Sequence, residues 1–324
     1  MSTHSYVAGV DGGATKTTAL IADAADGKIL GKGKSGSSNY HNIGVKTATE
    51  SIRDALKRAM KDARIVGRPE IVVVALAGID SEKDKRTASH FVRNARMAHK
   101  SIVIHDSVAA LYTATNGGPG IVVNSGTGSF AAGTNNKGQY ARAGGWGYII
   151  GDEGSAYEIG KKAINMAFRS FDKREAHTIL VGLLEQRFGV RQLDELVSRV
   201  YAGDLTVEKI ARLVPLVARA ARTDIISRRI LANAGIELGE LACAVAQRLK
   251  MTNDYFTVGA VGGSFKSGHY IMRPFKSRIK EECPNARVVR LRVDPAQGSL
   301  AIALAKVSES ASHQLNAFLS GLLC

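Results

Sequence analysis

One turn pattern occurs twice in this chain, and it constrains the fold more than any other feature. Residues 7–23 (VAGVDGGATKTTALIAD) and 120–138 (GIVVNSGTGSFAAGTNNKG) each run from an apolar stretch through a Gly/Thr-rich bend into another apolar stretch. Each predicts strand, tight turn, strand. Glycines in both bends allow positive φ and close approach of a ligand, so successive backbone N–H groups are free to bind oxygen anions. Two such turns could hold a polyphosphate from both sides.

Length and composition indicate a globular protein of two domains. The chain has 324 residues, of which 45% are hydrophobic and 23% are charged. No apolar run reaches the roughly 18 residues that cross a bilayer, and the N-terminus lacks a basic-then-apolar signal region. The cysteines are far apart and form no CxxC pair, so they indicate neither a disulfide framework nor a metal site. We expect a cytoplasmic protein without a membrane partner.

The charge balance is strongly basic. Lys and Arg number 44 against 29 Asp and Glu, a formal net charge of +15. Such a balance suits a nucleic-acid binder. However, the basic residues are spread along the chain without a block interleaved with aromatics, which are only 6% of the residues. We therefore expect no nucleic-acid partner, and a positive field that favours the approach of an anionic substrate such as ATP.

Apolar periodicity predicts an α/β chain whose second half repeats the first. In the first half we expect strands at 6–11, 17–23, 28–34 and 70–80, helices at 45–64 and 81–98, and a strand followed by a helix within 101–115. After residue 119 the strand–turn–strand pattern begins again. Residues 154–169 and 174–250 are largely helical by pattern, before a strand at 255–261 and a final helix at 298–307. The second half therefore carries a large helical insertion.

Other glycine motifs compete for the phosphate role. No GxxxxGK[ST] occurs, so a P-loop fold is unsupported. Gly126-Thr-Gly128-Ser-Phe-Ala131 fits the dinucleotide pattern GxGxxG/A and follows a strand. That fold requires a helix to open there. Here Gly133 and the turn-forming residues 134–138 end the FAAG stretch, so we expect a hairpin and disfavour a dinucleotide fold.

Five motifs in the same order resemble the N-acetylglucosamine kinase group of the BadF/BadG/BcrA/BcrD-type ATPase family, within the actin, sugar-kinase and heat-shock-chaperone superfamily. They are DGGATKT (11–17), His105-Asp106, NSGTGS (124–129), GGWGYIIGDEGSAYEIG (144–160) and VGAVGGSFKSG (258–268). The resemblance runs from about residue 6 to 306. It implies an α/β fold of two ribonuclease-H-like (actin-like ATPase) domains with an interdomain cleft. Their expected bounds are 1–116, completed by a C-terminal helix at about 297–308, and 117–296, with the helical insertion at about 160–250.

The same family contains sugar kinases and ATPase activators. The activators hold an iron–sulfur cluster with cysteines, and neither Cys243, Cys283 nor Cys324 is near a strand end that could do so. The cysteine-rich zinc motif of the repressor/kinase branch is also absent. A sugar kinase is therefore the expected class, and an ATP-driven switch or activator is the alternative of another class.

Phosphoryl transfer needs the γ-phosphate in line with a hydroxyl, divalent metal on the phosphates, and a group that takes the hydroxyl proton. The resemblance places Asp11, at the end of the first strand, on Mg²⁺ through water. An Asx-type turn is the alternative explanation of Asp11. The residues expected to line the β- and γ-phosphates are Gly12, Gly13, Thr15 and Lys16. Gly126, Thr127 and Gly128 form the expected second cradle, for which an ordinary hairpin is the alternative.

Asp106 is the candidate general base. It ends the strand SIVIH, where side chains project from the carboxyl edge of a sheet, and a helix follows at once. Spacing alone leaves a helix N-cap equally open, because Asp is a favoured cap. The resemblance favours the base. His105 alternates to the other face of the strand and is expected to be a packed or surface histidine.

The resemblance also implies sugar and adenosine contacts. The expected sugar ligands are Asn39, Asp106, Ser129, Gly145, Trp146, Gly147 and Asp152. Core packing is the alternative for Trp146, and a negative first turn of helix 154–169 is the alternative for Asp152 and Glu153. Glu153 stays open as a metal-binding or structural group. The expected adenosine end consists of Gly262, Gly263, Ser264 and Ser267, where a strand breaks and continues as a helix.

The expected activity is ATP- and Mg²⁺-dependent transfer of phosphate to a primary hydroxyl of a hexose or amino sugar. N-acetylglucosamine, glucosamine and glucose are the leading substrates, and 2-keto-3-deoxygluconate, a sugar acid, is the alternative. Asn39-Tyr-His replaces a tryptophan-bearing loop of the vertebrate-like kinases, which leaves acetamido preference open. Domain closure on the sugar is expected, because it excludes water from the γ-phosphate. Homodimers are common in the family.

Overall fold

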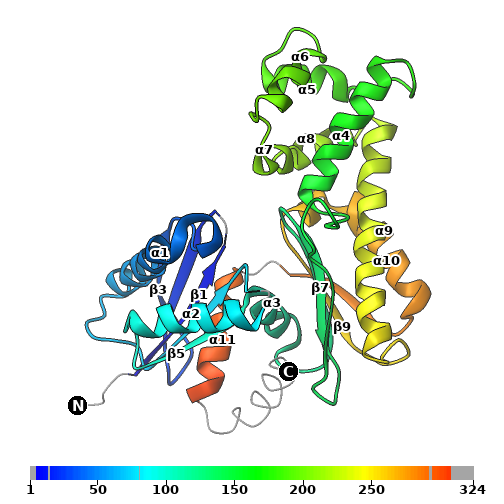
Figure 1. Cartoon of the computed structure of the whole chain (residues 1–324). Helices are drawn as coiled ribbons and strands as arrows, with labels where there is room; N and C mark the ends of the chain where they lie inside the picture. The colour runs from blue at the N-terminus through cyan, green and yellow to red at the C-terminus, as the bar shows by residue number, and fades with distance from the viewer. Residues whose placement is uncertain (1–4, 14, 80, 292–293, 308–324) are drawn as a thin grey trace. The chain divides into compact units, whose positions relative to one another are not determined.

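The chain folds into two compact units (Figure 1). The structure, a computed structural model, describes residues 5–13, 15–79, 81–291 and 294–307. The first unit contains Met1–Pro119, Asn136–Gln139 and Arg292–Cys324, and the second contains Gly120–Asn135 and Tyr140–Leu291. Among the described residues, no helix is long and apolar enough to cross a membrane.

The first unit is built on a five-stranded sheet of order β3-β2-β1-β4-β5. Its strands are β1 (Tyr6–Gly12), β2 (Thr17–Asp23), β3 (Ile29–Ser35), β4 (Ile71–Leu76) and β5 (Lys100–His105). Strands β1, β2 and β3 pair antiparallel, whereas β1, β4 and β5 are parallel. The carboxyl ends of β1, β4 and β5 therefore meet at one edge, where the side chains that follow them gather.

Helices cover both faces of this sheet. They are α1 (Tyr40–Asp62), α2 (Glu82–Asn94), α3 (Asp106–Thr115) and α11 (Pro295–Val307). Val10 and other apolar residues of the sheet form a core with α1 and α2, including Ile52 and Phe91. Gly9 lies on the opposite face, where α11 packs so closely that a Cβ at Gly9 would be 2.1 Å from the backbone nitrogen of Leu300. The C-terminal helix thus completes the first unit.

The second unit repeats this topology. Its sheet has the order β10-β9-β6-β7-β8, with strands β6 (Gly120–Ser125), β7 (Ser129–Thr134), β8 (Tyr140–Gly144), β9 (Thr257–Val261) and β10 (Arg287–Arg290). Strands β6, β7 and β8 pair antiparallel, and β6, β9 and β10 are parallel. When the strands of each unit are numbered along the chain, the second sheet read from β8 has the same order as the first: third, second, first, fourth, fifth. The repeat expected from the two turns is confirmed.

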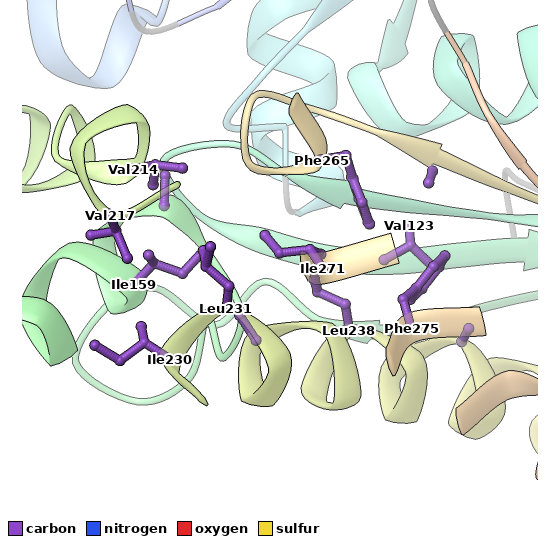
Figure 2. Packing of buried hydrophobic residues seen from close by; sticks show 14 of the residues in the cluster. Val123, Ile159, Val214, Val217, Ile230, Leu231, Leu238, Phe265, Ile271 and Phe275 are labelled. Atoms are coloured by element: carbon purple, nitrogen blue, oxygen red, sulfur yellow. The ribbon is translucent and has the colours of Figure 1, made fainter. Parts of the chain in front are cut away.

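The helical insertion follows β8. It consists of α4 (Ala156–Phe171), α5 (Leu180–Phe188), α6 (Glu195–Tyr201), α7 (Val207–Ala211), α8 (Val214–Ala220) and α9 (Ile225–Arg248). After β9 come a 3₁₀ helix, η1 (Ser264–Ser267), and α10 (His269–Glu282). Leu238 of α9, Phe275 of α10 and Val123 of β6 lie in one buried cluster (Figure 2). The insertion is therefore anchored to the second sheet by a continuous apolar core.

Most elements lie where the apolar pattern predicts them. One difference is the start of α1. The helix was expected to begin at residue 45, but it begins at Tyr40 with one turn that a non-helical Gly44 separates from the rest. Strands β8 and β10 were not predicted. Their sequences, YARAG and RVVR, are short and only partly buried, so they lack the long apolar alternation that marks a strand in isolation.

Candidate functional site

The first glycine turn joins β1 to β2. The N–H of Gly13 donates to the carbonyl of Lys16 (3.0 Å), and the N–H of Ser38 donates to the carbonyl of Gly13 (3.1 Å). A Cβ at Gly12 would be 2.2 Å from Oγ of Ser38 and 2.5 Å from Cδ2 of Leu76, so these two buried side chains would have to shift to admit it. The Ser38 hydroxyl is buried and has no hydrogen-bond partner among the described residues. Ser38, which supports the turn through its backbone hydrogen bond to Gly13, was not predicted from the sequence.

Two predicted residues of the first unit meet at the carboxyl edge of its sheet. Asp11 lies near the end of β1, and Asp106 follows β5, with β4 between the two strands. Two ordinary strand spacings therefore separate the backbones of β1 and β5 by roughly 10 Å. The pKa of Asp11 is raised to about 7, chiefly by burial and then by the charges of Asp106 and Asp294, while Lys16 acts in the opposite direction. Asp294, which precedes α11, was also missed, because only folding brings it near β1.

This carboxylate environment suits a divalent cation. A cation at Asp11 would offset both its burial and the repulsion from its neighbours. Among the described residues, no group of three or more His, Cys, Asp or Glu side chains could hold a metal by itself. Mg²⁺ bound here would therefore keep water or phosphate oxygens as most of its ligands, as it prefers.

His105 and Asp106 differ from the sequence expectation. The N-cap of α3 is His105, whose Nδ1 accepts the N–H of Ser107 (3.1 Å), and Asp106 is the first helical residue. The N-cap explanation of Asp106 is therefore wrong. His105 is packed, with a side chain 17% exposed, but its cap role was not anticipated. Oδ1 of Asp106 is buried and accepts no hydrogen bond from the described part of the chain.

Asn39, the predicted sugar ligand of the first unit, caps α1. Its Oδ1 accepts the N–H of His41 (3.1 Å). Gly78, with φ +82°, lies against the amide, since a Cβ there would be 3.4 Å from Oδ1 of Asn39. The cap holds the side chain, half-buried, beside the loop that follows β4.

The second glycine turn is a tight hairpin between β6 and β7. Ser125 pairs with Ser129, and the N–H of Gly126 donates to the carbonyl of Gly128 (2.9 Å). The dinucleotide alternative, which needs a helix at this place, is excluded. The first N–H of α4, from Ala156, donates to the carbonyl of Gly126 (2.8 Å), so the helix supports the turn.

Residues 152–154 are bound to this hairpin. Oδ1 of Asp152 accepts the N–H of Ser129 (3.1 Å), and the Ser129 hydroxyl donates to the carbonyl of Glu153 (2.6 Å). The pKa of Asp152 is raised, mainly by burial. The N–H groups of Ser129 and Gly147 act in the opposite direction, because they stabilise the charged carboxylate. The predicted sugar residues Ser129, Gly147 and Asp152 are thus brought together.

Two alternative explanations in this region are wrong. Helix α4 begins at Ala156 with Ser155 as its N-cap, so Asp152 and Glu153 precede the helix instead of forming a negative first turn. The Trp146 side chain is 70% exposed, so it does not pack in a core. Gly145 and Gly147, which flank it, have φ of +76° and +87°, conformations that favour glycine. The loop therefore presents the only tryptophan to solvent.

The predicted adenosine segment joins the same edge of the second sheet. Gly262, with φ +108°, lies against β6, where a Cβ would be 2.2 Å from the carbonyl oxygen of Ser125. The hydroxyls of Ser264 and Ser267 are buried without a partner among the described residues, and such groups are satisfied when a ligand supplies one. Gly263 and Ser267 also line a pocket of about 790 Å³.

The pocket beside Gly263 is basic. It is completed by α8 and the start of α10, and its charged lining is Arg212, Arg219, Arg222 and Lys266, with His269 beside them. Tyr270 adds an aromatic wall. A pocket lined by cations, one aromatic ring, Gly263 and Ser267 suits an anionic nucleotide. The basic wall from α8 was not expected from sequence, because it comes from the insertion.

Comparisons with known proteins agree with this arrangement. The model of the BadF/BadG/BcrA/BcrD ATPase family matches residues 8–303. An N-acetylmuramic acid/N-acetylglucosamine kinase of Clostridium acetobutylicum is 33% identical over 308 residues, covering 92% of this chain and 98% of the relative. An N-acetyl-D-glucosamine kinase of Dictyostelium discoideum is 29% identical over 309 residues, covering 91% and 97%.

A solved structure extends the likeness to the fold. A proposed N-acetylglucosamine kinase from Chromobacterium violaceum has a TM-score of 0.74 and 28% identity, covering 93% of this chain and 99% of that one. Together with the repeated sheet order, this likeness identifies the two sheets as ribonuclease-H-like domains of the actin-like ATPase type.

Proposed function

Because this chain belongs to the BadF/BadG/BcrA/BcrD ATPase family, we propose that it is an ATP-dependent sugar kinase acting on a primary hydroxyl of a hexose or amino sugar. The relatives named as N-acetylglucosamine kinases make N-acetylglucosamine, glucosamine and glucose the first substrates to test. A sugar acid, 2-keto-3-deoxygluconate, is the second. The proposed phosphate donor is ATP in the cytoplasm. No nucleic-acid partner is proposed.

The observation that carries the proposal is Asp106. Its side chain is 31% exposed, and it lies at the strand edge where Asp11 also lies. An accessible carboxylate at this edge can take a proton from a substrate hydroxyl as that hydroxyl oxygen attacks the γ-phosphate. Asp106 is therefore proposed as the general base and as a ligand of the reacting hydroxyl.

Asp11 and the first turn are proposed to hold the phosphates. Mg²⁺, when bound, would neutralise charge that develops on the transferred phosphoryl group. Asp11 would hold it through water. The backbone and side chains proposed for the β- and γ-phosphates are Gly12, Gly13, Thr15 and Lys16. The packing of Ser38 and Leu76 favours glycine at position 12 in any case, so a substitution at Gly13 tests the phosphate role more directly.

The second unit is proposed to bind the rest of the nucleotide. Gly126, Thr127 and Gly128 would approach the phosphates from their hairpin. The basic pocket lined by Gly263 and Ser267 would hold the adenosine, with the buried Ser264 hydroxyl as a further donor. Cations around this pocket favour the anionic nucleotide over a neutral ligand.

The sugar ligands are proposed from both units. Asn39 would contribute an amide, and Ser129 and Asp152 would contribute groups that already hydrogen-bond each other. The exposed ring of Trp146, between Gly145 and Gly147, offers an apolar face for stacking on a sugar ring. Glu153 follows Asp152 and is exposed, so it is not assigned a sugar role.

A sugar panel tests the proposal. Purified protein with Mg-ATP is offered N-acetylglucosamine, glucosamine, glucose and 2-keto-3-deoxygluconate, and ADP release is followed. The matched control is 6-deoxyglucose, which lacks the primary hydroxyl of glucose. We expect sugar-stimulated ADP release that the deoxy sugar does not support. Steady hydrolysis that no sugar stimulates would instead favour the ATP-driven switch.

A further inference from the structure

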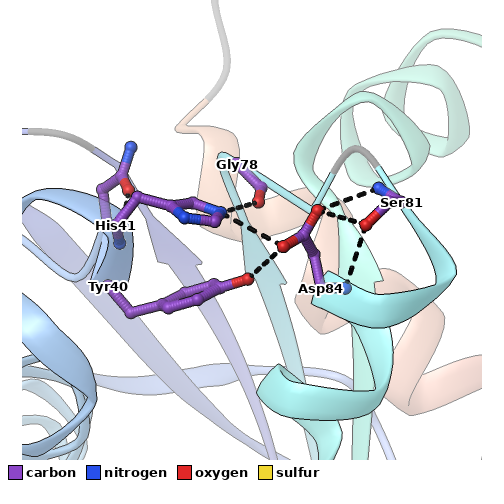
Figure 3. A network of polar contacts seen from close by, with 6 residues as sticks. Tyr40, His41, Gly78, Ser81 and Asp84 are labelled. Carbon is purple, nitrogen blue, oxygen red and sulfur yellow. Dashed lines mark hydrogen bonds and ion pairs between the residues drawn. The ribbon is translucent and has the colours of Figure 1, made fainter.

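Asp84 connects the first turns of α1 and α2. Its Oδ1 accepts the hydroxyl of Tyr40 (2.7 Å) and lies 3.4 Å from Nε2 of His41, while its Oδ2 accepts the N–H of Ser81 (3.1 Å) (Figure 3). Hydrogen bonds from the Ser81 hydroxyl and then from Tyr40 hold the pKa of Asp84 below its usual value. Both carboxylate oxygens are thus occupied. We call Tyr40, His41, Ser81 and Asp84 the Asp84 clamp.

His41 joins the clamp to the loop after β4. Its Nε2 lies 2.9 Å from the carbonyl oxygen of Gly78. A carbonyl and a carboxylate only accept, so Nε2 must carry the proton. The ring of Tyr40 stacks on His41, with centroids 4.2 Å apart, and meets the edge of Phe91 at 5.7 Å. Aromatic packing, one hydrogen bond to Gly78 and the 3.4 Å approach to Asp84 therefore hold the imidazole in one place.

Asn39 lies at the end of this chain of contacts. The backbone N–H of His41 donates to Oδ1 of Asn39, which settles the orientation of the amide, because an N–H must face an oxygen. Nδ2 of Asn39 is then the group left to donate to a ligand. Gly78 closes the other side, since a Cβ there would be 3.4 Å from Oδ1 and 3.5 Å from Nδ2.

We propose that the Asp84 clamp determines how the protein recognises its sugar, by holding Asn39 with Nδ2 as a hydrogen-bond donor to an acceptor oxygen of the substrate. The acceptor is a hydroxyl or an acetamido carbonyl oxygen, and an ammonium group is disfavoured there because it has no lone pair. This inference rests on the proposed function. Tyr40, His41 and Asp84 are positioning residues, because they act through Asn39.

Variants of His41 separate positioning from chemistry. His41→Ala removes the side chain that contacts Gly78 and Asp84, so the KM for the sugar should rise about tenfold, which corresponds to about 1.4 kcal/mol. The kcat and the KM for ATP should change less than about twofold, because ground-state and transition-state binding of the sugar are lost together. In His41→Gln an amide N–H can donate to Gly78 again, so most of the sugar affinity should return.

Asn39→Ser tests whether His41 acts through Asn39. Serine is a good N-cap, so the helix start is kept while the amide donor is lost. The KM for the sugar should rise at least as much as in His41→Ala. In the Asn39→Ser background, His41→Ala should then add nothing, whereas independent residues would give additive effects. Ile52→Val, in the buried face of α1, is the stability control and should leave both KM values unchanged.

The outcomes distinguish this inference from the proposed function. A wild-type protein without sugar-stimulated ADP release overturns both. Wild-type turnover with an unchanged sugar KM in His41→Ala overturns the clamp alone. The same holds if His41→Ala lowers kcat at constant KM, if glutamine fails to restore affinity, or if the effects of His41→Ala and Asn39→Ser add.

Discussion

Nδ1 of His105 lies 2.9 Å from Oδ1 of Asp106, and the same nitrogen accepts the N–H of Ser107 at 3.1 Å. Because it accepts from a backbone N–H, Nδ1 carries no proton and has none to donate to Asp106. Oδ1 of Asp106 therefore keeps its acceptor capacity.

Asp106→Asn should abolish transfer while leaving the nucleotide site intact. The amide keeps the size of the side chain but cannot take the hydroxyl proton, so kcat should fall by about 10²- to 10⁴-fold. ATP affinity, measured by calorimetry, should stay within about threefold, since Asp106 is not among the proposed phosphate ligands. A variant that retains full kcat would remove Asp106 from the role of base.

His105→Asn should lower kcat without weakening either substrate. Asparagine still caps α3 through its side-chain oxygen, so stability should change by less than about 1 kcal/mol. The imidazole that lies 2.9 Å from Oδ1 of Asp106 is replaced by a smaller side chain, so the carboxylate is positioned less firmly and kcat should fall about tenfold. Steady-state kinetics with both substrates varied would decide this. A rise in KM at constant kcat would contradict it.

Asp11 should make stability depend on pH in the protein without nucleotide. Its pKa is about 7 in the folded chain and 3.8 in the reference state, so the folded chain binds more protons between these values. The contribution of Asp11 to the free energy of unfolding is therefore present at low pH and is lost as pH rises from about 4 to about 7. The loss is on the order of a few kcal/mol. Neutral Asn cannot lose a proton.

Asp11→Asn should accordingly raise the melting temperature at pH 8 while changing it little at pH 4, although activity is lost. The comparison is made by thermal unfolding without Mg²⁺ or ATP. Asp26→Asn, a change at an exposed turn of the same unit, is the control. A wild-type pH profile that Asp11→Asn leaves unaltered would show that Asp11 is not buried as a carboxyl beside Asp106 and Asp294.

Ser264→Ala should weaken ATP binding without destabilising the fold. The Ser264 hydroxyl is buried and has no partner among the described residues, so its removal relieves an unsatisfied polar group. We expect equal or higher stability, together with a Kd for ATP raised about tenfold. Unfolding curves and calorimetry on the same preparation test both halves. Lower stability with unchanged ATP affinity would assign the hydroxyl a structural role.

Much of the fold was predictable because its signals are local. Two bends could be predicted from glycines that lie next to alternating apolar residues. They are the bend at Gly12 and Gly13 and the bend at Gly126 and Gly128. Gly133 and the turn-forming residues 134–138 were enough to predict a hairpin there and to set aside the dinucleotide fold. The position of Asp106 after an apolar strand is also visible in the sequence, but spacing alone left a helix N-cap equally open, and the resemblance favoured the base.

The remaining features depend on residues far apart in the chain. Asp294 and Ser38 approach the first turn only because α11 and the start of α1 pack against β1. The exposure of Trp146, the cap role of His105 and the contact of Asp152 with Ser129 follow from backbone conformation, which composition and periodicity do not report. Local patterning was thus sufficient for the repeated α/β fold and its two glycine turns. The environment of each carboxylate, and hence its chemistry, required the folded chain, because burial and neighbouring charge arise only from long-range packing.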